Sequence, residues 1–376
     1  MEAVTIHAAW SPGEVRIAVI AGGALVDFVI WRPGSPDGVG DIHRGRVIAI
    51  MPSMAGAFVA LSGAGGTVAE GFLPDSAGAK GVTEGTILTV RITRAAQGGK
   101  GPRLSTRTEW IESAGRQDLG LLRPGIDPLR ELAARFPGAD VLVDDPALAA
   151  SLRADLGERL KRVAEAFDDA IETEIDALGS PEITLASGMR LSVYPTPALV
   201  AIDVDGGGAL GGRDGAARRH LALNASVLPE IARQIRLRNL SGAIFVDLAG
   251  LKARQRASLG PELTAALSAD PSRPRFLGFT ALGLAEISRP RVRAPLHEVL
   301  SGPLARGLVA LRAITRSSRA DPGRRLGLRA APAVVTALEA DPFALADLAR
   351  ITGGRLTSRS DPSLTEDGWR LEELDG

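Results

Sequence analysis

The chain of 376 residues contains no cysteine, which excludes disulfide bonds and metal sites built on thiolates. Only four histidines are present, so no structural zinc site is expected. No apolar run approaches the roughly 18–20 residues of a membrane-spanning helix. The formal net charge is zero, so any binding of nucleic acid has to come from local basic patches.

The first residues also lack a targeting signal. Residues 1–6 show no basic stretch followed by an apolar core, so we do not expect a signal peptide and place the protein in the cytoplasm. Hydrophobic residues make up 45% of the chain, as in a soluble globular protein. The length is sufficient for two or three domains, each with its own core.

Short strand-like segments fill the first third of the chain. Residues 14–20 and 24–30 predict a hairpin with a glycine-rich turn. A closely spaced series of further strands, separated by glycine turns, predicts a small barrel of the OB-fold type. The strands of this predicted barrel are 45–50, 56–61, 70–73, 86–93 and 103–106.

After residue 110 the pattern becomes mixed. Leucine and other apolar residues recur at helical spacing from Leu148 to Ile171, which predicts one helix beginning after Asp145. From residue 183 strands and helices alternate, which is typical of an α/β unit. We predict helices over 228–237 and 254–267, strands over 243–248 and 275–279, and a β-α-α-β-β unit over 326–372.

Two aspartates each end a strand-like run. Asp203 closes the run 198–203, Asp247 closes the run 242–247, and the stretch 231–238 between them predicts a basic amphipathic helix. A strand, a crossover helix and a parallel strand bring both carboxylates to the same sheet edge. Their mutual repulsion favours a hard cation such as Mg²⁺. This arrangement suits metal-assisted cleavage of a phosphodiester, and Asp205 points to the same face as Asp203.

Two other interpretations of this region stay open. A single aspartate at a strand end often caps a helix or lies in a solvated loop. The glycines of 206–211 match the spacing of a dinucleotide-binding loop, which would indicate an oxidoreductase. The acidic residue that such a site requires at the end of the next strand is missing, so a flexible loop beside a substrate is favoured.

The predicted barrel combines aromatic and basic side chains. Phe58 and Phe72 lie on different strands, and each alone could belong to the core. OB-folds hold single strands by stacking bases on aromatic side chains while basic residues follow the backbone. The basic residues around the two phenylalanines include Arg46, Arg94, Lys100 and Arg103.

Taken in order, these segments resemble the bacterial ribonuclease E/G endoribonucleases over nearly the whole chain. The segments that carry the resemblance are 40–46, 52–59, 71–74, 99–106, 201–205, 230–247 and 286–289. Agreement of this many segments in the same order is far more specific than any one motif.

The resemblance implies a multi-domain protein of the α+β and α/β classes. An OB-fold barrel over 37–109 would be inserted in an RNase H-like subdomain formed by 1–36 and 110–180. A DNase I-like α/β catalytic subdomain would follow over 181–298. A connector and a small α+β C-terminal domain would occupy 299–376.

The resemblance also implies an activity and its residues. Asp203 and Asp247 would be the Mg²⁺ ligands of an endoribonuclease that cuts single-stranded RNA, and Asp205 would contribute through water. The products would carry 5′-phosphate and 3′-hydroxyl ends, in RNA processing or decay. Phe58 and Phe72 would hold bases, and Lys100 and Arg94 would contact the RNA.

The chain departs from the family pattern in several places. Asp205 stands where the family has Asn, and Ala281 stands where it has Arg. Residues 289–295 continue without the zinc-link cysteines, so a zinc-mediated dimer is excluded and we expect a monomer or weak homodimer. Residues 107–124 leave no room for the 5′-phosphate sensor domain. The glycine-rich 206–212 lacks polar side chains, so a catalytically impaired relative that binds RNA by occupancy is the rival hypothesis.

Overall fold

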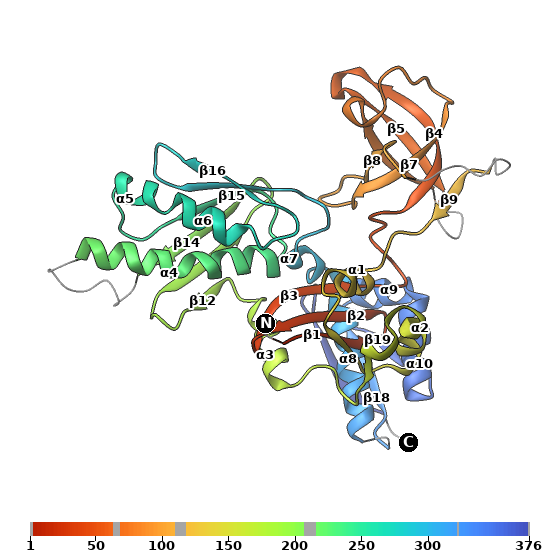
Figure 1. The fold of residues 1–376 in the computed structure, drawn as a ribbon. Helices are drawn as coiled ribbons and strands as arrows, with labels where there is room; N and C mark the ends of the chain where they lie inside the picture. The colour runs from red at the N-terminus through yellow and green to blue at the C-terminus, as the bar shows by residue number, and fades with distance from the viewer. Residues whose placement is uncertain (1–2, 63–67, 110–117, 207–215, 322, 375–376) are drawn as a thin grey trace.

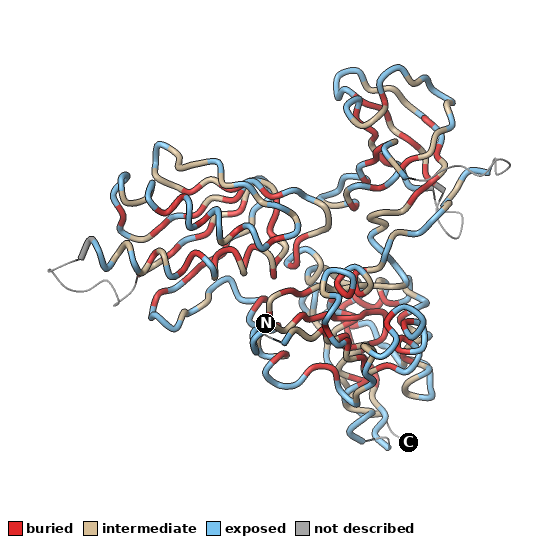
Figure 2. Tube along the Cα trace, viewed as in Figure 1, coloured by how far each residue is buried: buried red, intermediate tan, exposed pale blue. Residues whose placement is uncertain are grey.

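The structure, a computed structural model, describes residues 3–62, 68–109, 118–206, 216–321 and 323–374. Its strands form four sheets, one of which closes into a barrel. Figure 1 shows the barrel standing apart from the rest, with the sheet of β12 to β17 on one side and the first and last sheets packed together below. Figure 2 shows a separate buried interior in each part.

The first sheet combines the start of the chain with a later segment. Its order is β11-β10-β1-β2-β3, and both pairings that involve β10 are parallel. Helices cover both of its faces, which explains why its strands are almost continuously apolar. The strands are β1 (Val4–Ser11), β2 (Glu14–Ala21), β3 (Ala24–Trp31), β10 (Asp140–Val143) and β11 (Leu160–Arg162), and the helices are α1 (Pro128–Arg135), α2 (Pro146–Leu156) and α3 (Asp169–Ala177).

The predicted hairpin is present as β2 and β3, but the single helix predicted from Leu148 to Ile171 is wrong. Asp145 caps α2 as expected, since its side chain accepts a hydrogen bond from the Leu148 amide. The helix stops at Gly157, whose φ of 55° no other residue type adopts as easily. A 3₁₀ turn, η3 (Gly157–Arg159), and strand β11 follow before α3 begins. The apolar residues keep a helix-like spacing through β11 and α3 because each of these two elements packs apolar side chains of its own against a core.

The barrel is inserted between β3 and β10 of the first sheet. Strand β4 pairs with both β5 and β7, which closes a five-stranded barrel that fits the predicted OB-fold. Its interior is apolar, while alternate residues face outward. The strands are β4 (Ile42–Met51), β5 (Gly56–Ser62), β6 (Val68–Pro74), β7 (Ile87–Arg94) and β8 (Arg103–Ser105); β9 (Gly120–Arg123) pairs with β4, and η1 (Pro52–Met54) and η2 (Asp75–Ala77) connect strands.

The second sheet has the order β12-β13-β14-β15-β17-β16, and helices pack on one face of it. Strands β14 and β15 are parallel and are joined through α4, as predicted. The helix predicted over 254–267 divides at Leu259, because Pro261 starts a new helix. The elements are β12 (Glu182–Thr184), β13 (Arg190–Pro195), β14 (Val200–Asp205), α4 (Ala216–Leu237), β15 (Gly242–Asp247), α5 (Ala253–Ser258), α6 (Gly260–Leu267), β16 (Arg275–Phe279) and β17 (Ala285–Arg289).

The last part has the predicted β-α-α-β-β order, and a long helix that was not predicted from the sequence precedes it. Its sheet has the order β19-β18-β20. The elements are α7 (Leu296–Val299), α8 (Pro303–Ala320), β18 (Leu326–Ala330), α9 (Pro332–Glu339), α10 (Pro342–Thr352), β19 (Ser358–Ser360) and β20 (Trp369–Glu373). Within the described ranges, no helix is both long and apolar enough to cross a membrane.

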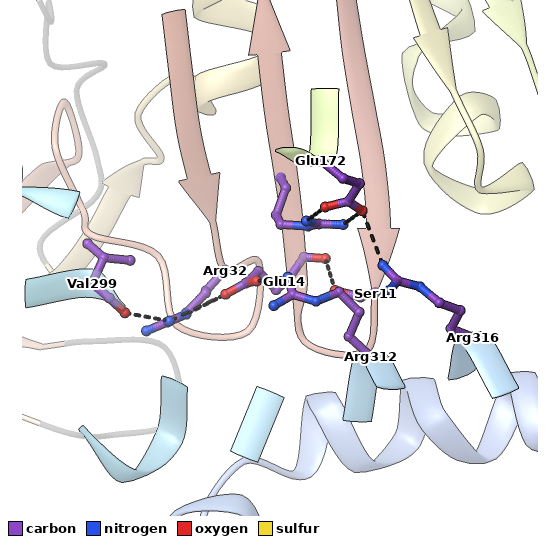
Figure 3. Close-up of polar contacts among 8 residues, drawn as sticks. Ser11, Glu14, Arg32, Glu172, Val299, Arg312 and Arg316 are labelled. Atoms are coloured by element: carbon purple, nitrogen blue, oxygen red, sulfur yellow. Dashed lines mark hydrogen bonds and ion pairs between the residues drawn. The ribbon is translucent and has the colours of Figure 1, made fainter. Parts of the chain in front are cut away.

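Charged side chains join helix α8 to the first sheet (Figure 3). Glu14, at the start of β2, is only 4% exposed and accepts hydrogen bonds from Arg32 and Arg312. Arg32 also donates to the Val299 carbonyl at 2.9 Å. A second carboxylate, Glu172 of α3, pairs with Arg316 of α8 at 3.2 Å. The last domain is therefore attached to the first sheet by ion pairs, one of them around a buried carboxylate.

Candidate functional site

The two strand-end aspartates lie side by side. Because β14 and β15 are parallel, Asp203 stands directly opposite Asp247 in the register. Both side chains are exposed, whereas their neighbours Ile202 and Val246 point into the core beneath α4. The juxtaposition predicted from the sequence is therefore present, on the face of the sheet opposite the helices.

Asp205 lies two residues further along the same face. Its carboxylate accepts a hydrogen bond from Arg190 of β13 at 2.8 Å, and Arg190 lies 3.8 Å from Glu182. Both members of the Asp205–Arg190 pair are about half exposed. Asp205, which the sequence suggested as an auxiliary metal ligand, is thus already paired with Arg190 of the neighbouring strand.

The electrostatics of this face favour a bound cation. Partial burial raises the pKa of Asp203, and the negative charges of Asp247 and Asp205 raise it further. Among the described residues no cluster of three or more acidic or histidine side chains converges as a ready metal cage. A pair of carboxylates is sufficient for Mg²⁺, which keeps several of its waters and takes only one or two protein carboxylates.

Helix α4 fixes the loop that follows Asp247. Asn224 is 0% exposed at a position of the helix that otherwise packs into the core. Its Nδ2 donates to the Ala249 carbonyl at 2.9 Å, and the Nδ1 of His220, one turn earlier, lies 3.2 Å from the Gly250 carbonyl. Carbonyl groups only accept, so both side chains act as donors.

Gly250 itself suits this contact. Its φ of 61° favours glycine, and a Cβ there would lie 2.9 Å from the Nδ1 of His220. Asn224 and His220 were not among the residues predicted from the sequence. The available signal was a polar residue at a core position of an amphipathic helix, since an asparagine there is costly unless it is hydrogen-bonded.

The barrel carries the second group of predicted residues in one row. Phe58 and Phe72 stand opposite each other on β5 and β6, with ring centroids 5.6 Å apart in an edge-to-face arrangement. Neither ring is buried. Phe72 is paired with Arg103 on β8, and Arg103 with Arg94 on β7. The four side chains therefore follow one another across four strands.

At one end of this row, positively charged side chains repel one another. The pKa of Arg94 is lowered, first by burial and then by the positive charges of Arg103 and Arg291. An anion such as a phosphate group would relieve that repulsion. Lys100 is exposed in the turn bridged by Gln97, and Arg46 is exposed on β4 beside β5.

The barrel adjoins the second sheet at the end remote from the aspartates. The Ala95 amide, directly after β7, donates to the Val292 carbonyl at 2.8 Å. Val292 follows β17, whose last residue Arg289 pairs with Gly242 at the start of β15. An RNA strand that touches both the barrel row and the aspartates of one chain would have to run along the sheet, in the arrangement of Figure 1.

The glycine-rich segment 206–212 lies almost wholly outside the described residues, so neither the dinucleotide interpretation nor the proposed loss of contacts there gains support from the fold.

Comparison with known proteins shows which family this chain is similar to. Residues 147–292 match the family model of the ribonuclease E/G family. The chain is 25% identical over 469 aligned positions to ribonuclease G of Escherichia coli strain K12, covering 94% of this chain and 96% of that protein. It is 24% identical to ribonuclease G of Haemophilus influenzae, covering 80% and 82%. It is also 37% identical over 121 positions to ribonuclease E of a Nostoc species, covering 32% and 17%.

Proposed function

Because this chain belongs to the ribonuclease E/G family, we propose that it is an endoribonuclease that cuts single-stranded RNA with the help of Mg²⁺. We further propose that the products carry 5′-phosphate and 3′-hydroxyl ends. The observation that supports this function best is the in-register pair Asp203 and Asp247, exposed on the helix-free face of the sheet. An RNA-binding protein without catalysis has no need of two adjacent carboxylates whose repulsion raises a pKa.

In this proposal Asp203 and Asp247 hold the metal, both in the ionised form. When bound, Mg²⁺ supplies an activated water and stabilises the charge that develops at the phosphate. Asp205 contributes less than the other two carboxylates, since it is already paired with Arg190. Asn224 and His220 keep the chain after Asp247 in place, so that the second carboxylate stays beside the first.

The barrel supplies the hold on the RNA. Phe58 and Phe72 stack on bases, and Arg103, Arg94, Lys100 and Arg46 neutralise phosphates around them. Because these basic residues gather on the barrel, a chain with zero net charge can still bind a polyanion. No cysteine is available for a zinc link between two copies of the chain.

The test is cleavage of a 5′-labelled, A/U-rich single strand by the purified protein, with Mg²⁺ or with a chelator. We expect internal cleavage that depends on Mg²⁺, with 3′ fragments that a 5′-monophosphate-dependent exonuclease degrades. Binding of the strand without any cleavage in Mg²⁺ would contradict the proposal and favour the rival, a protein that acts by occupancy.

A further inference from the structure

The helix-free face of the second sheet carries two aromatic side chains beside the aspartates. On neighbouring strands Tyr194 is paired with Ala201, and Ala201 with Phe245. Ala201 precedes Asp203 by two residues on β14, so both point to the same face. The rung Tyr194–Ala201–Phe245 is therefore the next one along from the rung that contains Asp203 and Asp247, about 7 Å away.

These aromatic side chains are not part of a core. Tyr194 is the only tyrosine of the chain, and it is 48% exposed. Phe245 is half-buried and belongs to none of the buried clusters, which on this sheet lie on the side of α4 and α6. An exposed tyrosine and a half-buried phenylalanine outside the buried clusters are not explained by packing of this core.

The small residue between them leaves space. Neighbouring strands lie about 4.8 Å apart, so the backbones of Tyr194 and Phe245 are separated by roughly 10 Å. Ala201 fills little of that interval, and side chains stand perpendicular to a sheet. This register leaves room above Ala201 between the two aromatic residues, and we call that space the slot.

We propose that Tyr194 and Phe245 hold the nucleobase next to the phosphate that is cleaved. This inference rests on the proposed function and adds a substrate contact to the same site. The position of the slot indicates a nucleobase as its ligand. The slot lies next to Asp203 and Asp247, where the RNA backbone must pass during cleavage. The carboxylates repel that backbone, whereas stacking on an aromatic face is available to every base.

The test is a cycle that combines protein variants with a modified strand. Cleavage by the unmodified protein is measured on a strand with one mapped cleavage site and on the same strand with an abasic residue beside that site. We expect the abasic strand to be cut about tenfold less efficiently, the size of one lost stack. With Tyr194→Ala or Phe245→Ala, the intact strand should lose a similar factor and the abasic penalty should shrink to about twofold or less.

Two controls separate stacking from folding. Tyr194→Phe keeps the ring, so the penalty for the abasic strand should be retained in full. Ile126→Ala removes a side chain that is 68% exposed, in the connector between barrel and first sheet, and should preserve the full abasic penalty. Melting temperatures of all variants should agree within a few degrees, and Tyr194→Ala carries the test if Phe245→Ala is unstable.

The outcomes distinguish the two levels of the account. If the unmodified protein does not cut the intact strand in Mg²⁺, the proposed function fails. If it cuts, but Tyr194→Ala shows the same abasic penalty, only the base slot is overturned. A third outcome is that Tyr194→Ala leaves cleavage unchanged and alters the self-association of the protein. That result would assign this face to a protein contact and would also overturn the slot.

Discussion

The raised pKa of Asp203 supports the proposed cation site at this edge of the sheet. Its pKa is raised by burial and by two neighbouring carboxylates, which means that ionisation of this group opposes folding when no cation is present. A residue that served only to cap or to solvate a loop would gain nothing from such a position. A bound cation would offset this electrostatic cost of ionising Asp203.

We predict that Asp203→Asn stabilises the protein in metal-free buffer near neutral pH. The folded state keeps the Asp203 proton to higher pH than the unfolded chain does, so stability falls as pH rises through the range above the ordinary value of 3.8. The amide has no charge to lose, and the gain should be below about 1 kcal/mol because the group is exposed. Urea unfolding at several pH values measures it.

The matched control is Asp140→Asn, at the exposed start of β10. That change should leave the stability near neutral pH close to that of the unmodified protein. A metal-free Asp203→Asn protein that is less stable than the unmodified one at neutral pH would contradict the electrostatic description of the site.

Asn224 provides a second prediction at the residue scale. Asn224→Leu keeps the branching and the number of side-chain heavy atoms but leaves the Ala249 carbonyl without its donor, so the loop after Asp247 should loosen. We expect a kcat about 10–100 times lower, a raised Mg²⁺ requirement and a nearly unchanged KM for RNA. Hydrogen exchange of the amides at 249–251 should become faster.

Ser226→Ala is the control for this prediction, because Ser226 lies on the same helix but is exposed and bonds only to Leu223. It should match the unmodified protein in exchange and in cleavage. Normal cleavage by Asn224→Leu at low Mg²⁺ would mean that the buried Leu248 and Leu251 alone hold the loop.

At the scale of elements, the barrel row makes a prediction that separates binding from folding. Phe58→Ala or Phe72→Ala should weaken binding of single strands by about 1–3 kcal/mol, because each removes one stacking surface. The melting temperature should change little, because both rings face outward. Titration of a labelled strand in a chelator measures the first effect and calorimetry the second.

Ile87→Ala is a suitable control on the same barrel, since Ile87 is a 40% exposed residue of β7. Its affinity should stay normal. A loss of about 3–5 kcal/mol of stability in Phe58→Ala, without a separate effect on affinity, would instead identify a core residue.

The elements that could be predicted from the sequence are those in which one local signal dominates. The hairpin of β2 and β3, the five barrel strands and the parallel pair β14 and β15 follow from alternation, glycine turns and strand-end aspartates. The pairing of Asp203 with Asp247 followed because a crossover helix between two strands leaves a parallel arrangement as the usual outcome.

The rest depended on contacts that no local pattern contains. The leucine spacing from Leu148 onward runs on through Leu160, although the chain turns at Gly157 and enters the sheet as β11. Strand β9 belongs to the barrel only through its pairing with β4. Asn224 is recognisable as a loop anchor only when Ala249 is known to lie against it.

At the scale of the whole molecule, Glu14 should determine whether the first sheet and the last domain unfold together. Glu14→Gln removes the charge between Arg32 and Arg312 and leaves both guanidinium groups facing each other at the start of β2. Breaking a buried ion pair from one side costs about 3 kcal/mol. We expect calorimetry to show a lower melting temperature and a transition that divides in two.

Glu373→Gln is the comparison, because its pair with Arg324 at 2.6 Å is largely exposed. That change should cost less than about 1 kcal/mol. Equal effects of the two changes would show that the cluster of Figure 3 does not couple the domains.

In the proposed function the barrel binds bases at one end of the second sheet, and the two carboxylates at its other end direct cleavage of the RNA that the barrel holds. The direct measurement compares the unmodified protein with Asp247→Asn on a labelled single strand in Mg²⁺. We predict that cleavage falls more than about a hundredfold while the affinity for the strand stays within about twofold. Equal cleavage by both proteins would contradict the assignment of this edge as the active site.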